Sequence, residues 1–201
     1  MEYTTAFTAG PLMPERSARI VEEYHDKDTP LEDVDASILE INSRKGRQRK
    51  AAEIKRRLES ASESVWEDLP ELPTPEQALV LYYCCLKTYP LIFDFHMEAV
   101  LPAWRSADRS FGPSGTKRFL EQRSEAHPEI ESWKESTWQK VRQVMVQMLR
   151  EAGLLQEGRL RRVDLPEIFW ARFAEAGALW FLEAAFLSEP ERHAVAQSLR
   201  G

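Results

Sequence analysis

The sequence predicts an all-α fold with at most one short β-hairpin. Apolar residues recur three and four positions apart through most of the 201-residue chain, which is the spacing of one helix face. Prolines, glycines and short polar runs separate these periodic segments, as expected between short helices. Alternating runs of β-branched and polar residues, which would indicate strands, are few. With 43% hydrophobic and 30% charged residues, the chain has the composition of a globular protein.

The N-terminal third is predicted to hold three helices. Pro14 and Pro30 are start signals for the first two, because proline is favoured in the first turn of a helix. Residues 42–47, which include Gly46, predict a turn before the third helix. A helix, a short turn with a glycine and a second helix together have the outline of a helix-turn-helix. The three predicted helices cover residues 15–25, 31–41 and 48–58.

A run of positive charge covers this turn and the third helix. Residues 42–58 contain eight Lys and Arg against one acid, Glu53, although the chain carries a net charge of −6. At 100° per residue, Ala51, Ile54 and Leu58 form an inward stripe, and the cations are predicted to face solvent. Such cations bind nucleic-acid phosphates by displacing counterions. The run therefore predicts phosphate contacts by Arg44, Lys45, Arg47, Arg49, Lys50, Arg56 and Arg57.

Three prolines between residues 69 and 75 predict a linker, since they exclude a helix interior. We therefore predict two small helical domains, over residues 1–70 and 71–201. In the second domain, helices are predicted over residues 75–86, 91–101, 116–126 and 137–152, with two or three more between 166 and 199.

The segment from residue 132 to 163 could also bind nucleic acid. Ser136 is a candidate N-cap for the helix over 137–152, and Gly153 is a candidate for ending it. Residues 154–163 then predict a hairpin that turns at Glu157-Gly158. A helix followed by a basic hairpin has the outline of a winged helix, and Gln, Lys and Arg suit base edges in a major groove. The residues predicted to form this second surface are Gln139, Lys140, Gln143, Arg150, Arg159 and Arg161.

Each of these surfaces has an ordinary structural alternative. The basic run could be a solvated face that is balanced by the acids at residues 59–76. The second segment could be a packed helix with a polar outside, followed by an ordinary loop. A basic helix also does not by itself distinguish RNA from DNA, so RNA binding stays open.

Several stretches together resemble the BrxA family, whose members are small components of BREX bacteriophage-exclusion systems. The resemblance covers nearly the whole chain, and its most distinctive part is the opening segment, residues 3–12. Asn42 ahead of the basic run ending Arg56-Arg57-Leu58 is a second part, and residues 136–155 are a third. The resemblance implies an all-helical cytoplasmic protein of anti-phage defence that binds double-stranded DNA and has no known enzymatic role.

The residues indicate no enzyme, metal site or cofactor. The four histidines lack metal-ligand spacing, and the adjacent Cys84 and Cys85 suit buried reduced thiols. Residues 112–117 look superficially like a phosphate loop, but their glycine spacing does not match a Walker motif. Asp94 and Glu98 would share a helix face as a structural pair. We therefore expect no catalytic residue, no cofactor and no small-molecule substrate. The longest apolar run, at 78–86, is too short for a membrane span.

The leading hypothesis is a non-enzymatic accessory protein that binds duplex DNA with little sequence specificity. Other proteins of the defence system are expected as further partners. In the alternative hypothesis the chain is an adaptor for larger enzymes of that system. It would dock through aromatic residues of the C-terminal helices, namely Trp170, Phe173, Trp180, Phe181 and Phe186.

Overall fold

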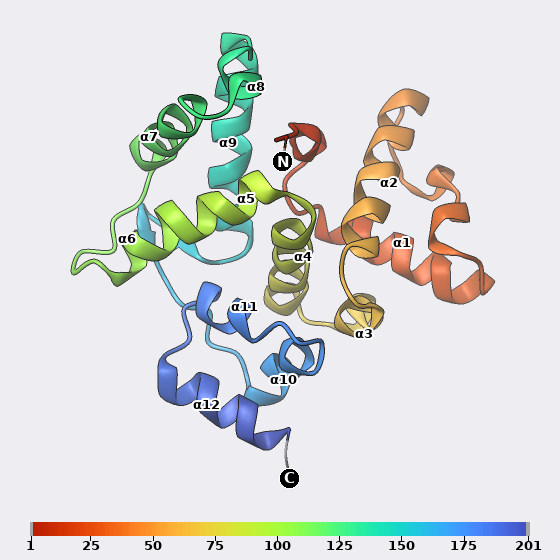
Figure 1. The fold of residues 1–201 in the computed structure, drawn as a ribbon. Coiled ribbons are helices and arrows are strands. Elements are labelled where there is room, and N and C mark those ends of the chain that lie inside the picture. The colour runs from red at the N-terminus through yellow and green to blue at the C-terminus, as the bar shows by residue number, and fades with distance from the viewer. Residues whose placement is uncertain (1, 200–201) are drawn as a thin grey trace.

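α-Helices dominate the computed structural model, which describes residues 2–199, so the predicted all-α fold is confirmed (Figure 1). The first six are α1 (Pro14–Lys27), α2 (Arg44–Glu59), α3 (Glu63–Trp66), α4 (Thr74–Thr88), α5 (Pro90–Phe95) and α6 (Leu101–Arg105). The other six are α7 (Pro113–Ser124), α8 (Pro128–Glu131), α9 (Glu135–Glu151), α10 (Glu167–Glu175), α11 (Leu179–Ala184) and α12 (Glu189–Ser198). Short 3₁₀ turns are η1 (Ala6–Ala9), η2 (Leu31–Asp33), η3 (Ala36–Ile38) and η4 (Leu69–Glu71).

Helix α4 lies at the centre of the molecule (Figure 1). All nine residues from Ala78 to Leu86 are buried, because α1, α2, α5 and α9 pack around it. Cys84 and Cys85 are free thiols inside this core, and burial raises the pKa of both. One cluster of buried side chains includes residues from before and after position 70. The division into two domains at that position stays a prediction.

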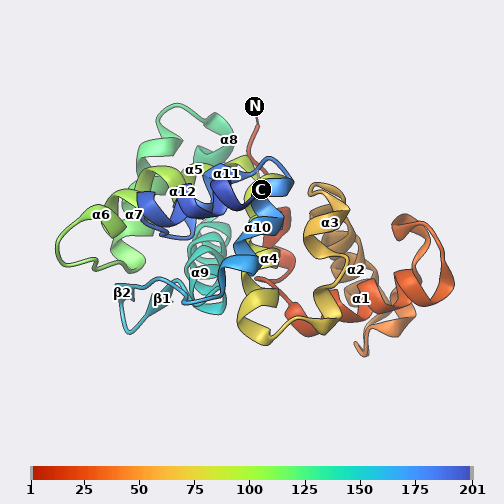
Figure 2. The same cartoon turned by 90° about the horizontal axis from the view of Figure 1, so that it is seen from below.

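The C-terminal helices complete the core. Figure 2, seen from below, shows α10, α11 and α12 in front of α4 and α9. Phe173 and Phe181 meet the Tyr83 ring edge-on, with centroids 5.2 and 5.1 Å away. The guanidinium of Arg172 on α10 donates to both carboxylate oxygens of Asp68, at 2.8 and 3.0 Å. Residues near the end of the chain are thereby tied to the segment after α3.

Helix α5 continues into α6 through a π-helical turn, His96–Val100, so the run extends past the predicted end at Leu101. The wider π turn precedes Pro102, whose ring would clash with a regular i−4 hydrogen-bond ladder. Within residues 2–199, no single helix is long and apolar enough to cross a membrane. Helix α4 and the Pro90–Arg105 run pass that test only as a pair, and the two are bent by 112°.

His96 in this π turn is fully buried. Its Nδ1 lies 2.7 Å from the hydroxyl of Tyr82, and its ring stacks on Phe186. Burial lowers the pKa of His96 to about 4, since no solvent stabilises the imidazolium.

This burial predicts a loss of stability in acid. The unfolded chain takes up a proton at His96 near its ordinary pKa of 6.5, whereas the folded chain does so near 4. The free energy of unfolding should therefore be unaffected above pH 6.5. It should fall as the pH drops toward 4, by up to about 3 kcal/mol in total. Urea unfolding of wild type and His96→Gln measures this, because paired carboxylates contribute equally to both. Parallel pH profiles of the two proteins would contradict it.

The segment between α1 and α2 differs from the prediction. The predicted helix over 31–41 is wrong, because that stretch forms the two 3₁₀ turns η2 and η3. The Lys55 ammonium on α2 donates to the main-chain oxygens of Glu32 and Val34, at 2.7 and 2.5 Å. The Asp35 carboxylate accepts from the Ser37 amide at 2.9 Å. These contacts hold the backbone in turns, and the helix-turn-helix outline fails here because its first helix is missing.

Helix α2 begins earlier than predicted. Residues 44–47 are helical and not a turn, and Gly46 lies in the first helical turn. The Ser43 side chain caps the helix by accepting from the Gly46 amide at 3.2 Å. The predicted N-cap at Ser136 is wrong. It lies inside α9, where Lys134 is the residue before the helix and makes no side-chain cap.

The predicted hairpin after α9 is confirmed. The left-handed Gly153 follows the end of α9 at Glu151, and strands β1 (Leu155–Gln156) and β2 (Arg159–Leu160) pair antiparallel. Both turn residues, Glu157 and Gly158, have positive φ, which fits a tight two-residue turn. A third extended segment, unforeseen from the sequence, adds to β2: Ser110 bridges Arg159, and the Phe111 amide donates to the Gly158 oxygen at 2.9 Å. Figure 2 shows this hairpin at the edge of the molecule.

Candidate nucleic-acid interface

The N-terminal half of α2 carries a group of positive charges that we call the α2 surface. Arg44, Lys45 and Arg49 are exposed, and Arg47 and Lys50 are half-buried. Within residues 2–199, none of the five lies within 4.0 Å of a carboxylate oxygen. Most other arginines differ. Arg19, Arg105 and Arg162, for example, each form an ion pair on the surface.

Arg44 and Lys45 lie in the first turn of α2, where the helix dipole is positive. A cation in that position is unfavourable by roughly 0.3–1 kcal/mol, and α2 has no acid in its first turn to offset it. The placement therefore lowers helix stability while concentrating positive potential at one end. An anionic ligand at this end of α2 would neutralise the cations and would itself interact favourably with the positive end of the helix dipole.

Arg16 on α1 extends the α2 surface, although no pattern in the sequence marks it. Burial and the nearby Arg16 together lower the pKa of Lys50, which indicates two positive charges close together. Arg16 is isolated in the sequence, so no charge run marks it. Arg16 joins the α2 surface only because α1 packs against α2.

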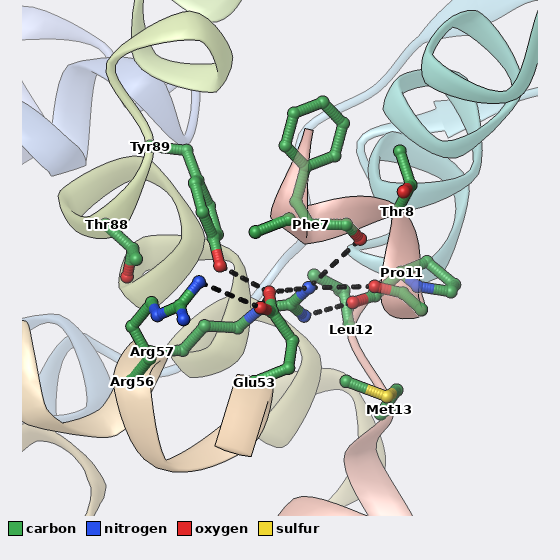
Figure 3. Close-up of polar contacts among 12 residues, drawn as sticks. Phe7, Thr8, Pro11, Leu12, Met13, Glu53, Arg56, Arg57, Thr88 and Tyr89 are labelled. Atoms are coloured by element: carbon green, nitrogen blue, oxygen red, sulfur yellow. Dashed lines mark hydrogen bonds and ion pairs between the residues drawn. The ribbon is translucent and has the colours of Figure 1, made fainter. Parts of the chain in front are cut away.

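Arg57 corrects the prediction. It was expected to contact phosphate, but its side chain is fully buried (Figure 3). Its Nε donates to the Glu53 carboxylate at 2.8 Å, and the hydroxyl of Tyr89 donates to the same carboxylate oxygen at 2.5 Å. The guanidinium also donates to the main-chain oxygens of Phe7 and Gly10, at 3.3 and 2.8 Å, and to that of Pro11. All of its hydrogen-bonding capacity is directed inward.

Arg56, its neighbour, is exposed as predicted. Its guanidinium lies 3.7 Å from the second carboxylate oxygen of Glu53. It therefore remains available to an external anion, but it is partly neutralised.

The second predicted surface lies on α9 and the hairpin, and we call it the α9 surface. Gln139, Lys140, Gln143 and Arg150 on α9 and Arg159 and Arg161 on the hairpin are all exposed. Some are already engaged: the Gln139 amide donates to Glu135 at 3.1 Å, and Arg161 donates to Gln156. Arg159 donates to the main-chain oxygen of Asp108 at 2.8 Å, which fixes it beside the third extended segment.

Three further cations near this surface were missed by the sequence analysis. Lys117 and Arg118 are exposed on α7, which packs against α9. Arg109 has a positive φ, and its guanidinium lies 3.8 Å above the Trp104 ring centroid. These residues lie outside the segment 132–163, and the fold brings them beside it, because α7 packs on α9 and the Arg109 main-chain oxygen accepts from the Leu160 amide at 2.8 Å.

The two surfaces begin on the same side of the molecule. Figure 1 shows α2 and α9 both running downward from the top of the view, with the N-terminal segment between them. The N-terminal end of each helix, where the dipole is positive, therefore points the same way. The structure thus gives two separated helices that carry exposed cations and share a common orientation.

The aromatic residues proposed for protein docking are mostly core. Trp170, Phe173, Phe181 and Phe186 are buried, and Trp180 is half-buried against Tyr83 and Phe93. In the part of the chain that is described, the exposed large apolar side chains are Ile168, Leu179 and Leu199. No group of three or more His, Cys, Asp or Glu residues there is arranged to hold a metal ion.

Comparisons with known proteins give the family. The family model described as BrxA matches residues 1–170. The chain is 28% identical over 167 residues to the "BREX protein BrxA" of Escherichia coli O9:H4 (strain HS), covering 79% of this chain and 78% of that protein. The fold is similar to the crystal structure of an uncharacterized protein from Magnetospirillum magneticum, with a TM-score of 0.77, 19% identity, and coverage of 92% of this chain and 98% of that one. The chain belongs to the BrxA family.

Proposed function

We propose that this protein is a non-enzymatic component of a BREX anti-phage system that binds duplex DNA, mainly through phosphate contacts and with little sequence specificity. The observation that carries the proposal is the α2 surface. Five cations gather there without ion-pair partners among residues 2–199, in a chain whose acids outnumber its bases by 33 to 27. Cations that only balanced nearby acids would be expected to pair with them, as Arg172 does with Asp68.

The elements around α9 support the proposal in a second way. A helical run, an extended segment at Ser110, α7, the short α8, α9 and then β1 and β2 follow each other, which is the order of a winged helix with one added helical turn. In such an arrangement α9 would enter the major groove and present Gln139, Lys140 and Gln143 to base edges. The hairpin would place Arg159 and Arg161 near the flanking backbone. Even so, these residues would contact DNA phosphates more often than base edges.

We predict a steep salt dependence of duplex binding. With six or more phosphate contacts, the affinity for a random-sequence DNA duplex should fall by about 10³ or more between 50 and 200 mM salt. Fluorescence anisotropy of a labelled duplex at several salt concentrations measures this, with duplex RNA as the competitor. No binding at the lowest salt concentration would exclude the proposal for the isolated protein and favour the adaptor hypothesis. Stronger competition by RNA than by DNA would favour RNA binding.

A further inference from the structure

The segment before α1, residues 2–12, crosses the molecule between α2 and α9 (Figure 1). We call it the N-terminal strap. It forms one 3₁₀ turn, η1, and is otherwise irregular. Irregular backbone has few internal hydrogen bonds, so its position depends on contacts with the elements around it.

The middle of the strap is bound to α2. Arg57 donates to three of its main-chain oxygens, and the Phe7 ring packs edge-on against Tyr89 at 5.5 Å. Glu53 holds the guanidinium in place from the same helix (Figure 3). Glu53 and Arg57 lie about one to four turns along α2 from the exposed cations of the α2 surface.

Both ends of the strap are bound on the other side. The Tyr3 amide donates to Glu129 on α8 at 3.0 Å, and its hydroxyl donates to Asp94 on α5 at 2.5 Å. The Leu12 amide donates to the Glu151 carboxylate, at the end of α9, at 2.9 Å. The strap is therefore fastened to the helix of each candidate surface, and both helices also pack on α4.

We infer that the strap fixes the α2 surface and the α9 surface in one relative orientation, so that a single duplex contacts both at once. This inference rests on the proposed function. Once one surface is bound, the second contact is intramolecular, which can raise the affinity 10²–10⁴-fold when the geometry fits. The same gain disappears when the two surfaces move independently. Arg57 is thus a positioning residue, although it touches no DNA.

The test uses a strap-release variant, Tyr3→Ala with Glu151→Ala. It removes the hydrogen bond from the Tyr3 hydroxyl to Asp94 and the Glu151 acceptor of the Leu12 amide, so it loosens both ends of the strap and leaves the buried Glu53–Arg57 pair intact. In an otherwise wild-type chain it should weaken duplex binding by about 10²-fold. The slope of log affinity against log salt concentration should also become shallower, because the phosphate contacts of one surface are lost. In a chain that already carries Arg44→Glu and Lys45→Glu, it should have a much smaller effect, because the weakened α2 surface then contributes little to binding. Thr4→Ala is the matched control, since Thr4 is an exposed strap residue that bonds only within the strap.

The outcomes separate this inference from the proposed function. Equal losses in the two backgrounds would show only general destabilisation, and no loss in the first would show that the surfaces act independently. Either result overturns the inference while DNA binding stands. Failure of the wild-type chain to bind duplex at all would overturn both. If circular dichroism shows that the double variant is unfolded, Tyr3→Phe with Glu151→Gln removes the Tyr3 hydroxyl and the charge that accepts from the Leu12 amide more mildly, and the same comparison decides.

Discussion

Replacing Arg44 and Lys45 together with Glu should weaken duplex binding by about 10²-fold or more and, in the same protein, raise the free energy of unfolding. Each lost phosphate contact lowers the affinity about tenfold near 0.1 M salt, and each new carboxylate adds repulsion. The stability gain arises because carboxylates in the first turn of α2 interact favourably with the helix dipole, where the native cations do not. We expect about 1–2 kcal/mol at low salt. Anisotropy and urea unfolding on the same preparation measure the two effects.

The matched control is Lys27→Glu with Lys87→Glu, which changes the net charge by the same amount. Both lysines are exposed and lie in the last turn of their helices, where the dipole favours a cation. The control should therefore lose stability and keep its affinity for DNA. If both pairs weakened binding equally, net charge alone would be responsible. If neither did, the α2 surface would lie outside the DNA contact.

Arg57→Met should lower the free energy of unfolding by about 3–5 kcal/mol, which is a large part of the stability of an ordinary domain. Methionine fills much of the space, but it leaves the Glu53 carboxylate buried with too few donors. Three main-chain oxygens of the strap also lose their partner. Chemical denaturation measures the change, provided that the variant folds at low temperature.

Two comparisons sharpen this prediction. Arg56→Met, one residue away, should change stability by less than about 1 kcal/mol, because Arg56 is exposed. Adding Glu53→Gln to Arg57→Met should recover part of the loss, because the uncompensated buried charge is then removed. A similar cost for Arg56→Met and Arg57→Met would mean that burial of the pair is not what stabilises this region.

Arg56 and Arg57 also show what the sequence could not reveal. Helical periodicity predicted that both side chains face solvent, because the sequence of α2 indicates only which side of this helix is apolar. The groups that bury Arg57 are main-chain oxygens of residues 7–11, almost fifty positions earlier. A carbonyl oxygen has no signature in the sequence, so no pattern of residue types could have revealed this contact.

The helices were predictable where the apolar spacing was long and a boundary carried proline, as for α1 and α4, or glycine, as for α9. The hairpin was predictable because Glu157-Gly158 suits a tight turn. The stretch 31–41 was not, because its turns depend on Lys55, a residue of the next helix. The caps show the same dependence on context: Ser43 caps a helix, whereas Ser136 lies within one.

The candidate surfaces were partly predictable. Twelve of the thirteen residues selected from the sequence are at least partly exposed, because charge and amphipathic pattern usually agree on which side faces water. Their use in DNA binding stays a prediction. Arg16, Arg109 and Arg118 could not be selected, since each joins a surface only through folding.

The packing of α10 and α11 on Tyr83 has a consequence for comparing members of the family. The family model ends at residue 170, in the middle of α10, whereas Phe173 and Phe181 beyond it cover the central helix. The end of the shared sequence pattern is therefore not a structural boundary in this protein. Relatives that diverge after this point must shield the same side of α4 with different apolar residues, and we expect that shield to vary in sequence while its volume is preserved.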